Sequence, residues 1–183
     1  MDNLYVSKHP MIAHKLGILR DINTEHQKFR ELVKEIAGLL AYEVLADLPT
    51  DPVDVQTPMG IAKCRELKEK VGLVPILRAG LGMVEGFWSF IPSAEVWHIG
   101  LYRDEQTLKP VQYYNKLPTE ATVSLCLILD PMLATGGSAT ATIDVLKHWG
   151  VKKIKFVGLI GAPEGIELVH KNHPEVPIHL ACV

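Results

Sequence analysis

The hydrophobic positions of the chain follow a helical period near the amino terminus and fall into short runs farther on. In TEHQKFRELVKEIAGLL, residues 24–40, apolar side chains recur every three or four residues, which predicts a long amphipathic helix. These side chains are Phe29, Leu32, Val33, Ile36 and Leu40. Thr24 followed by Gln27 has the spacing of a capping box, so we expect the helix to begin at Thr24. Residues 47–60 are rich in proline and acid, a pattern that predicts a linker or a surface excursion.

From Gly72 onward, short apolar runs alternate with segments of helical periodicity. The runs occupy residues 73–77, 95–101, 122–129, 153–160 and 177–183, and the helical segments occupy 81–90, 137–149 and 163–172. This alternation predicts an α/β fold with an open parallel sheet flanked by helices on both faces. Residues 102–121 are too polar for a core helix, and a connection of that length predicts a protruding β-arm. We expect a single domain over residues 1–183, with a helical part in 1–50 and an α/β core in 72–183.

The composition indicates neither a membrane nor a nucleic-acid partner. Hydrophobic residues make up 48% of the 183, but no apolar stretch approaches the ~20 residues of a membrane span. The first ten residues lack the apolar segment of a secretory signal. The 19 basic and 21 acidic residues leave no excess of positive charge to attract nucleic acid. Three cysteines without C-x-x-C spacing favour neither a disulfide nor a zinc site, and we expect a cytoplasmic protein.

The first candidate site follows the apolar run that ends at Asp130, in LCLILDPMLATGGSAT. Ligands of open parallel sheets bind beyond the carboxyl ends of strands, which is where Asp130 is expected. Gly136 and Gly137 let the backbone approach a ligand, and the start of the next helix offers N–H groups and the hydroxyls of Thr135, Ser138 and Thr140 to a phosphate. An acid beside a phosphate site suits a sugar phosphate. A triphosphate loop would need a lysine directly after the glycines, and none occurs before Lys147.

A second candidate site lies in VPILRAGLGMVEG, residues 74–86. Arg78 at the end of an apolar run, followed by small residues, can hold a pyrophosphate by paired hydrogen bonds. Gly80 and Gly82 also begin a dinucleotide-binding pattern, but Glu85 stands where its third glycine is expected. A nicotinamide-dependent dehydrogenase is therefore an alternative with weaker support.

The two loops, together with GLYRDEQTLKPV, GAPEGI and HPMIAHKLGILRD, resemble the uracil phosphoribosyltransferases. The resemblance covers nearly the whole chain. It implies a phosphoribosyltransferase-like fold and an enzyme that transfers the phosphoribosyl group of 5-phospho-α-D-ribose 1-diphosphate (PRPP) to uracil, giving UMP and diphosphate. The pair Asp130–Pro131 supports it, because many other phosphoribosyltransferases have two adjacent acids there.

The resemblance also implies roles for individual residues. Asp130 faces the ribose hydroxyls and, with Arg103 from the arm, is catalytic. Arg78, with the backbone of Ala79 and Gly80, holds the pyrophosphate, and Arg103 reaches the same phosphates. A strained, cis peptide bond is expected near Arg78 and Ala79. The PRPP loop continues through Pro131, Met132, Leu133, Ala134, Thr135, Gly136, Gly137 and Ser138, of which 134–138 surround the 5′-phosphate.

The same resemblance implies cofactors and partners. Mg²⁺ arrives with PRPP and is held by its oxygens, so no protein metal ligands are expected, although Asp104 and Glu105 could be read as metal ligands or bases. GTP is implied as an activator, and a homo-oligomer, dimeric or larger, is expected.

One expectation concerns the base. The sequence given ends at IHLACV, whereas the uracil enzymes continue with a glycine-rich segment that the resemblance connects with pyrimidine recognition. The sequence is therefore expected to contain the PRPP site but not the part that recognises uracil. An alternative is a catalytically silent regulatory homologue that binds nucleotide or RNA.

Overall fold

The computed structural model describes residues 3–103, 110–115 and 117–183. The elements are β1 (Leu4–Val6), α1 (Pro10–Leu19), α2 (His26–Val44), β2 (Thr50–Thr57), β3 (Gly60–Leu67), β4 (Val71–Leu77), α3 (Leu81–Trp88), β5 (Glu95–Val96), β6 (Ile99–Arg103), β7 (Pro110–Asn115), β8 (Leu125–Leu129), β9 (Met132–Leu133), α4 (Gly137–Trp149), β10 (Lys153–Gly161), α5 (Pro163–Asn172) and β11 (Ile178–Cys182). Among these helices, none is long and apolar enough to cross a membrane.

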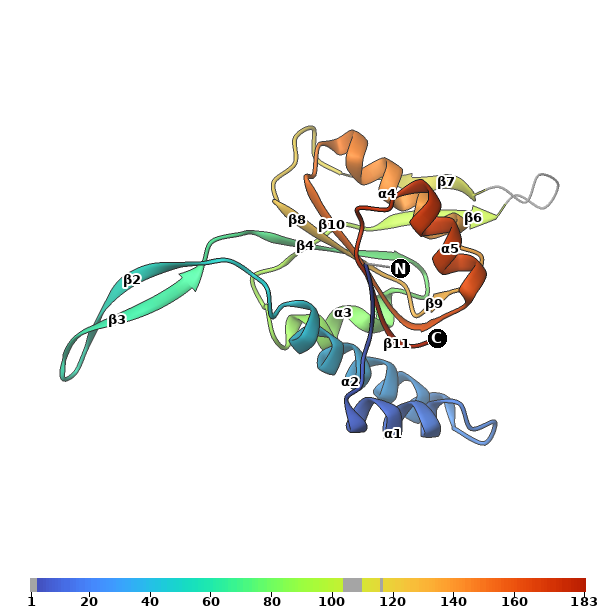
Figure 1. Ribbon diagram of the computed structural model, residues 1–183, viewed down its shortest axis with the longest axis horizontal. Helices are drawn as coiled ribbons and strands as arrows, with labels where there is room; N and C mark the ends of the chain where they lie inside the picture. The colour runs from blue at the N-terminus through green and yellow to red at the C-terminus, as the bar shows by residue number, and fades with distance from the viewer. Residues whose placement is uncertain (1–2, 104–109, 116) are drawn as a thin grey trace.

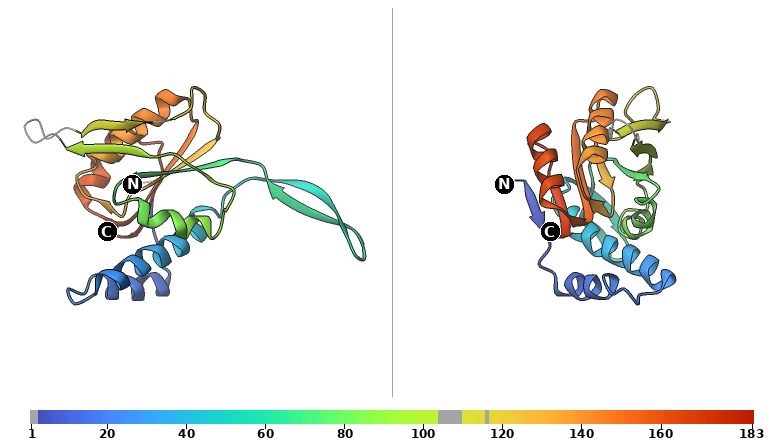
Figure 2. Two further views of the ribbon diagram at one scale, coloured as in Figure 1. Left: turned by 180° about the vertical axis from the view of Figure 1, so that it is seen from behind. Right: turned by 90° about the vertical axis from the view of Figure 1, so that its right-hand side faces the viewer.

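The main sheet has the order β1-β11-β10-β8-β4-β6-β7, with β5 beside β4 and β9 beside β10. Its described strand pairs are parallel except β6–β7, which is antiparallel. Helices α1, α2 and α3 lie on one face and α4 and α5 on the other (Figure 1, Figure 2). The prediction of an open parallel sheet between helices is confirmed. The short edge strand β1 is an element that the sequence pattern does not indicate.

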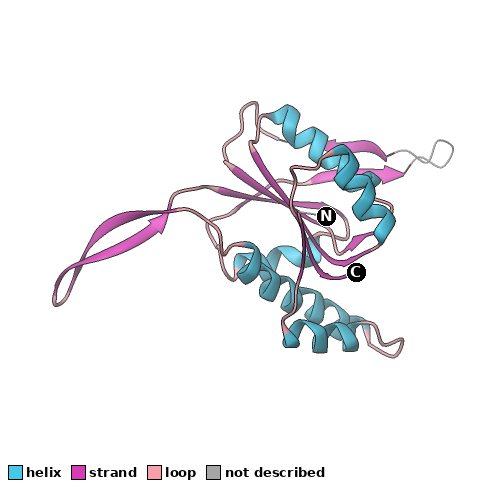
Figure 3. Ribbon diagram, in the orientation of Figure 1, coloured by secondary structure: helices cyan, strands magenta, loops and turns pink. Residues whose placement is uncertain are grey.

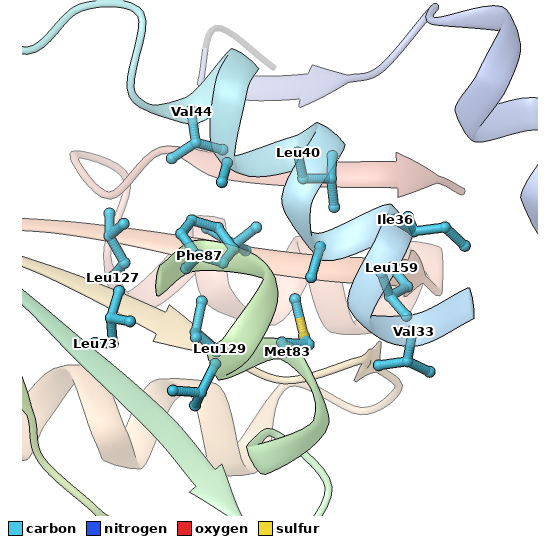
Figure 4. Close-up of a cluster of buried hydrophobic side chains, with 14 of the residues drawn as sticks. Val33, Ile36, Leu40, Val44, Leu73, Met83, Phe87, Leu127, Leu129 and Leu159 are labelled. Atoms are coloured by element: carbon cyan, nitrogen blue, oxygen red, sulfur yellow. The ribbon is translucent and has the colours of Figure 1, made fainter. Parts of the chain in front are cut away.

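Two hydrophobic cores lie on the two faces of the sheet. Strand β8 contributes side chains to both cores, because successive side chains of a strand point to opposite faces of the sheet. Leu125, Leu127 and Leu129 belong to the first core, whereas Cys126 and Ile128 belong to the second. Figure 4 shows the first core, where Ile36 of α2 and Phe87 of α3 are among the side chains gathered with those of the strands.

The start of α2 differs from the prediction. The helix begins at His26 with Glu25 as its N-cap residue, and no side chain caps it. The hydroxyl of Thr24 instead donates to the carbonyl of Ile18, 2.5 Å away, and closes the turn after α1. The capping box is therefore wrong, because a competing local hydrogen bond uses the hydroxyl. Phe29, placed on the apolar face by spacing, is 43% exposed.

The proline-rich segment forms part of an antiparallel hairpin, β2–β3, so of the two predicted alternatives it is a surface excursion and not a linker. Its strands pair from Thr50 opposite Leu67 to Thr57 opposite Gly60, and it extends away from the body of the molecule (Figure 1, Figure 3). Gly60 has φ +129° at the turn, a conformation that other residues rarely adopt. Met59 at this turn is 97% exposed and Ile61 is 70% exposed.

The α/β core follows the predicted boundaries closely. Helices α4 and α5 have the predicted ends, and α3 ends at Trp88 instead of residue 90. Gly150, with φ +98°, ends α4 in a left-handed cap. Strands β6 and β7 form an antiparallel hairpin that begins at Ile99, before the predicted start of the arm.

Candidate active site

The candidate site lies at the carboxyl ends of β4 and β8, which are neighbours in the sheet. After β4 the chain proceeds to β6 and β7 on one side, whereas after β8 it proceeds to β10 and β11 on the other. The strand order thus reverses between β4 and β8, and ligands of open α/β sheets bind outside such a point. Both loops singled out in the sequence start here.

The loop after β4 is held against the end of β8 by close packing. The peptide bond between Leu77 and Arg78 is cis, as expected for this loop. Arg78 and Ala79 are exposed, whereas Gly80 is buried. A Cβ atom on Gly80 would lie 2.2 Å from the carbonyl oxygen of Leu129, so only glycine permits this approach. The result is that Arg78 is carried by a loop that touches the residue immediately before Asp130.

The backbone of Gly80 is expected to help hold the pyrophosphate, but its amide already has a partner. Its amide donates to the carbonyl of Ile76 at 2.9 Å and is therefore engaged within the loop. A pyrophosphate role for the backbone of Gly80 has no support in this conformation. The guanidinium of Arg78 and the exposed Ala79 keep their predicted roles as proposals.

Asp130 lies directly after β8 in a half-buried position. Burial raises the pKa of its carboxyl from 3.8 to about 6, although the amide of Met132, which donates to Oδ1 at 3.4 Å, lowers it. Its own amide donates to the carbonyl of Val157 at 3.2 Å, which fixes its backbone to β10. A buried acid with a raised pKa in a strand-end loop is typical of a functional group and not of a surface charge.

The loop that follows is tied to β10 before it opens toward solvent. The carbonyl of Pro131 accepts from the amides of Leu159 and Ile160 at 3.2 and 3.0 Å, and that of Leu133 accepts from Ala162 at 2.8 Å. Within this segment, Met132 and Leu133 form β9 beside β10. The next two residues of the loop, 134 and 135, are exposed. The loop is therefore anchored at its base and accessible where it meets α4.

The amino terminus of α4 has the features of an anion site. Gly136 is its N-cap, with φ +78°, and Gly137 is its first residue. The first turn contains no acidic residue, while Lys147 and His148 lie in the last turn. The first amides of a helix have no partners within it, and its dipole favours an anion at this end. Exposed Ser138 lies in the first turn and adds a hydroxyl.

Thr140, the third residue whose hydroxyl is predicted to serve a phosphate, is half-buried, and this role stays a prediction. It lies one turn into α4, and its hydroxyl is buried without a hydrogen-bond partner among the described residues. Its amide donates to the carbonyl of Gly136 at 2.9 Å, as in a regular helix.

Two further close contacts support the loop, and the sequence carries only a weak sign of them. A Cβ atom on Gly165, at the start of α5, would lie 2.4 Å from the carbonyl oxygen of Ala134. One on Gly136 would lie 2.7 Å from the carbonyl oxygen of Gly165. The segment GAPEGI therefore supports residues 134–136, just before α4. The sign was a glycine at the start of a predicted helix, a place where helix formers are usual.

Other predicted site residues are only partly described. Arg103 ends β6, and its side chain is not described, so its role remains a prediction. Asp104 and Glu105 lie outside the described residues. In the described part of the chain, no group of three or more His, Cys, Asp or Glu could hold a metal ion.

Solved structures identify the fold. The structure of the AQ2163 protein from Aquifex aeolicus is similar, with a TM-score of 0.92 at 36% identity, over 98% of this chain and 86% of that one. Adenine phosphoribosyl transferase from Trypanosoma brucei shares the fold, with a TM-score of 0.63 at 12% identity, over 100% of this chain and 84% of that one. The fold is that of the phosphoribosyltransferases.

Sequence comparison defines the family within that class. The uracil phosphoribosyltransferase family matches residues 6–183. The uracil phosphoribosyltransferase of Roseiflexus sp. (strain RS-1) is 57% identical over 183 residues, covering 100% of this chain and 88% of that protein. That of Thermoanaerobacter sp. (strain X514) is 55% identical over 182 residues, covering 99% and 87%. The chain belongs to the uracil phosphoribosyltransferase family.

Proposed function

We propose that this protein transfers the phosphoribosyl group of PRPP to uracil and forms UMP and diphosphate. The observation that carries the proposal is Asp130, a half-buried carboxyl between the Arg78 loop and the glycine-rich start of α4, in a chain of this family. A silent regulatory homologue is not favoured, because relatives at 52–57% identity are named as transferases. A dehydrogenase is not favoured either, because the amide of Gly80 is engaged within its own loop.

Each part of PRPP has a proposed partner. The 5′-phosphate binds residues 134–138, where the dipole and free amides of α4 favour an anion. The ribose hydroxyls donate to the carboxylate of Asp130. The diphosphate binds the guanidinium of Arg78, with Arg103 as a second proposed partner from the arm.

The reaction exchanges one bond at the anomeric carbon of the ribose. The bond to diphosphate breaks first, so positive charge develops on the sugar, and a uracil nitrogen then forms the new bond and releases its proton to water. The carboxylate of Asp130 stabilises this charge most strongly in the transition state, when the charge is largest. Arg78 stabilises the negative charge that collects on the departing diphosphate.

The residues present fit a magnesium ion that the substrate brings, since the carboxylate of Asp130 balances positive charge and Arg78 is proposed to bind the diphosphate and not the metal. When bound, Mg²⁺ would neutralise charge on the diphosphate oxygens. The residues that would hold the metal with its substrate are therefore Asp130, through the ribose, and the loop of residues 78–79, through the diphosphate.

We further propose a homo-oligomer in the cytoplasm. The hairpin β2–β3 supports an oligomer, because Val55, Met59 and Ile61 on it are 40%, 97% and 70% exposed. Exposed apolar side chains gathered on a projecting element are typical of an interaction surface. GTP activation remains a proposal from the family resemblance alone.

The activity is tested by the formation of UMP from labelled uracil, PRPP and magnesium. Asp130→Asn keeps the size of the side chain but removes its charge, and we expect turnover to fall at least about 100-fold. Asp54→Asn on the hairpin removes an equivalent charge far from the site and should leave turnover unchanged. A change of less than a few-fold for Asp130→Asn at saturating PRPP would show that Asp130 is structural.

A further inference from the structure

A cavity lies at the opposite edge of the sheet from Asp130. Its volume is about 370 Å³, and its wall includes Leu125, the first residue of β8, and Lys153, the first residue of β10. Asp130 follows the other end of β8. The cavity is therefore separate from the catalytic loops, and its volume falls in the range of small-molecule sites.

The wall combines apolar side chains with lysines. The apolar part is made by Leu48, Pro49, Leu125, Val151, Ile154, Val176 and Pro177. Four lysines, at positions 147, 152, 153 and 155, face three carboxylates, those of Asp47, Glu69 and Glu175. Lysines thus exceed acids by one, and among the described residues Lys152 has neither an ion pair nor a side-chain hydrogen bond.

Lys155 gives the cavity a fixed positive charge. The residue is 8% exposed, and its Nζ donates to the carbonyl of Val44, the last residue of α2, at 2.9 Å. Nζ also contacts Oδ1 of Asp47 at 2.5 Å. Burying a lysine is costly unless partners satisfy it, so its place in the cavity wall is maintained by these contacts.

Asp47, the acid partner of Lys155, can be replaced by another anion. The side chain of Asp47 is 70% exposed, whereas that of Lys155 is 10% exposed. A phosphate oxygen could therefore replace Asp47 on Lys155 while the aspartate turns into water at little cost. Lys147 is similar, since its partner Glu175 is 58% exposed, although Lys147 also donates to Nδ1 of His173 at 2.8 Å.

We propose that this cavity is a second binding site, for a small organic phosphate whose ring packs on the apolar wall and whose phosphates bind Lys152 and Lys155. The ligand class follows from the two kinds of side chain in the wall. Lysines alone would bind any anion, and apolar side chains alone would bind any ring, so together they favour a ligand that has both. The site goes beyond the proposed transfer reaction, which uses the other edge of the sheet.

The test is methyl NMR of the full chain, titrated with ATP, adenosine and inorganic tripolyphosphate in separate experiments. Adenine is not the proposed substrate base, so these probes avoid a base site for uracil. We expect ATP to shift the methyl signals of Leu48, Leu125, Val151, Ile154 and Val176 saturably. Adenosine should have almost no effect, and tripolyphosphate should bind more weakly than ATP.

Variants assign the effect to the lysines. Lys152→Gln should weaken ATP binding about 2- to 5-fold, the effect of one exposed charge. Lys171→Gln, on α5 outside the cavity, is the matched control and should have no effect. Lys155→Met should cause a larger loss, and Lys152→Gln keeps the test valid if the buried substitution unfolds the chain.

Two results would overturn the proposal. Shifts confined to Leu133 and to Ala139, in the first turn of α4, would show that the phosphates bind only the catalytic loop. Unchanged cavity methyl signals at millimolar ATP would show that the cavity takes no such ligand.

Discussion

The most consequential single residue is Asp130, because its environment opposes the charge that its proposed role requires. Burial raises its pKa to about 6, so the folded protein binds the proton of this carboxyl more tightly than the unfolded chain does. Between roughly pH 4 and 6 this group therefore makes the fold less stable as the pH rises, and the cost is fully present at neutral pH.

Replacing the charge with a neutral group should stabilise the fold at neutral pH. A pKa shift of about two units corresponds to at most ~3 kcal/mol, so we expect Asp130→Asn to raise the free energy of unfolding by about 1–3 kcal/mol at pH 7.5. At pH 4 the native carboxyl is protonated, and the gain should largely disappear. Urea unfolding at both pH values measures this. A variant less stable than the parent at pH 7.5 would contradict the assignment.

At the scale of elements, the site depends on how closely loops approach strands. Gly80 brings the loop after β4 against the end of β8, and this contact sets the separation of Arg78 and Asp130. The contact involves backbone atoms on both sides, so no side chain can move to make room.

Adding one methyl group at Gly80 should therefore damage binding. In Gly80→Ala the new Cβ would meet the carbonyl of Leu129, which forces the loop outward. We expect PRPP affinity to fall at least about 10-fold and stability to fall by about 1–3 kcal/mol, measured by calorimetry with magnesium and by urea unfolding. Gly82→Ala is the matched control, because its Cβ would meet only the end of the Val33 side chain, at 3.2 Å. Equal PRPP affinity of Gly80→Ala and the parent would refute the proposed geometry.

Several elements could be predicted from sequence because their signals are local. The ends of α4 and α5 are defined by Gly137, Gly150 and Pro163, whose conformational preferences hold in many contexts. The hairpin β2–β3 was not predicted as strands, because Pro52 and the aspartates masked its alternating valines. The capping box failed because the carbonyl of Ile18, in the last turn of α1, competed for the hydroxyl of Thr24.

The candidate site, like the fold, could be predicted only in part from the sequence. Asp130 could be placed because an apolar run ends at it, and the structure has it at a strand end. The contacts of Gly80 and Gly165 could not be predicted, since they join segments far apart in sequence. Sequence pattern therefore located the polar groups but not the packing that positions them.

For the whole molecule, the main feature is an elongated shape in which the β2–β3 hairpin extends from the body (Figure 1). An isolated two-stranded hairpin is marginally stable in water, so one carrying exposed apolar residues is expected to be covered by another copy of the chain.

Charges on the hairpin should weaken this association. We expect the double variant Met59→Glu and Ile61→Glu to shift the protein toward the monomer in sedimentation velocity, because both side chains would be buried in the interface. Ile22→Glu is the control, since Ile22 is also 97% exposed but lies in the turn after α1. A parent protein that is already monomeric would exclude this role for the hairpin.

The interlocked glycines of the site have a consequence for how the protein can change. At Gly80, Gly136 and Gly165 the neighbouring backbone already fills the space of a side chain, so the damaging event is the gain of an atom and not the loss of a functional group. A scan that removes side chains by alanine substitution would ordinarily pass over glycines, yet here alanine itself is the disruptive residue. Tolerance should therefore differ sharply between positions: exposed Glu167 and Lys171 of α5, outside the site, should accept many replacements, whereas these three glycines should accept none.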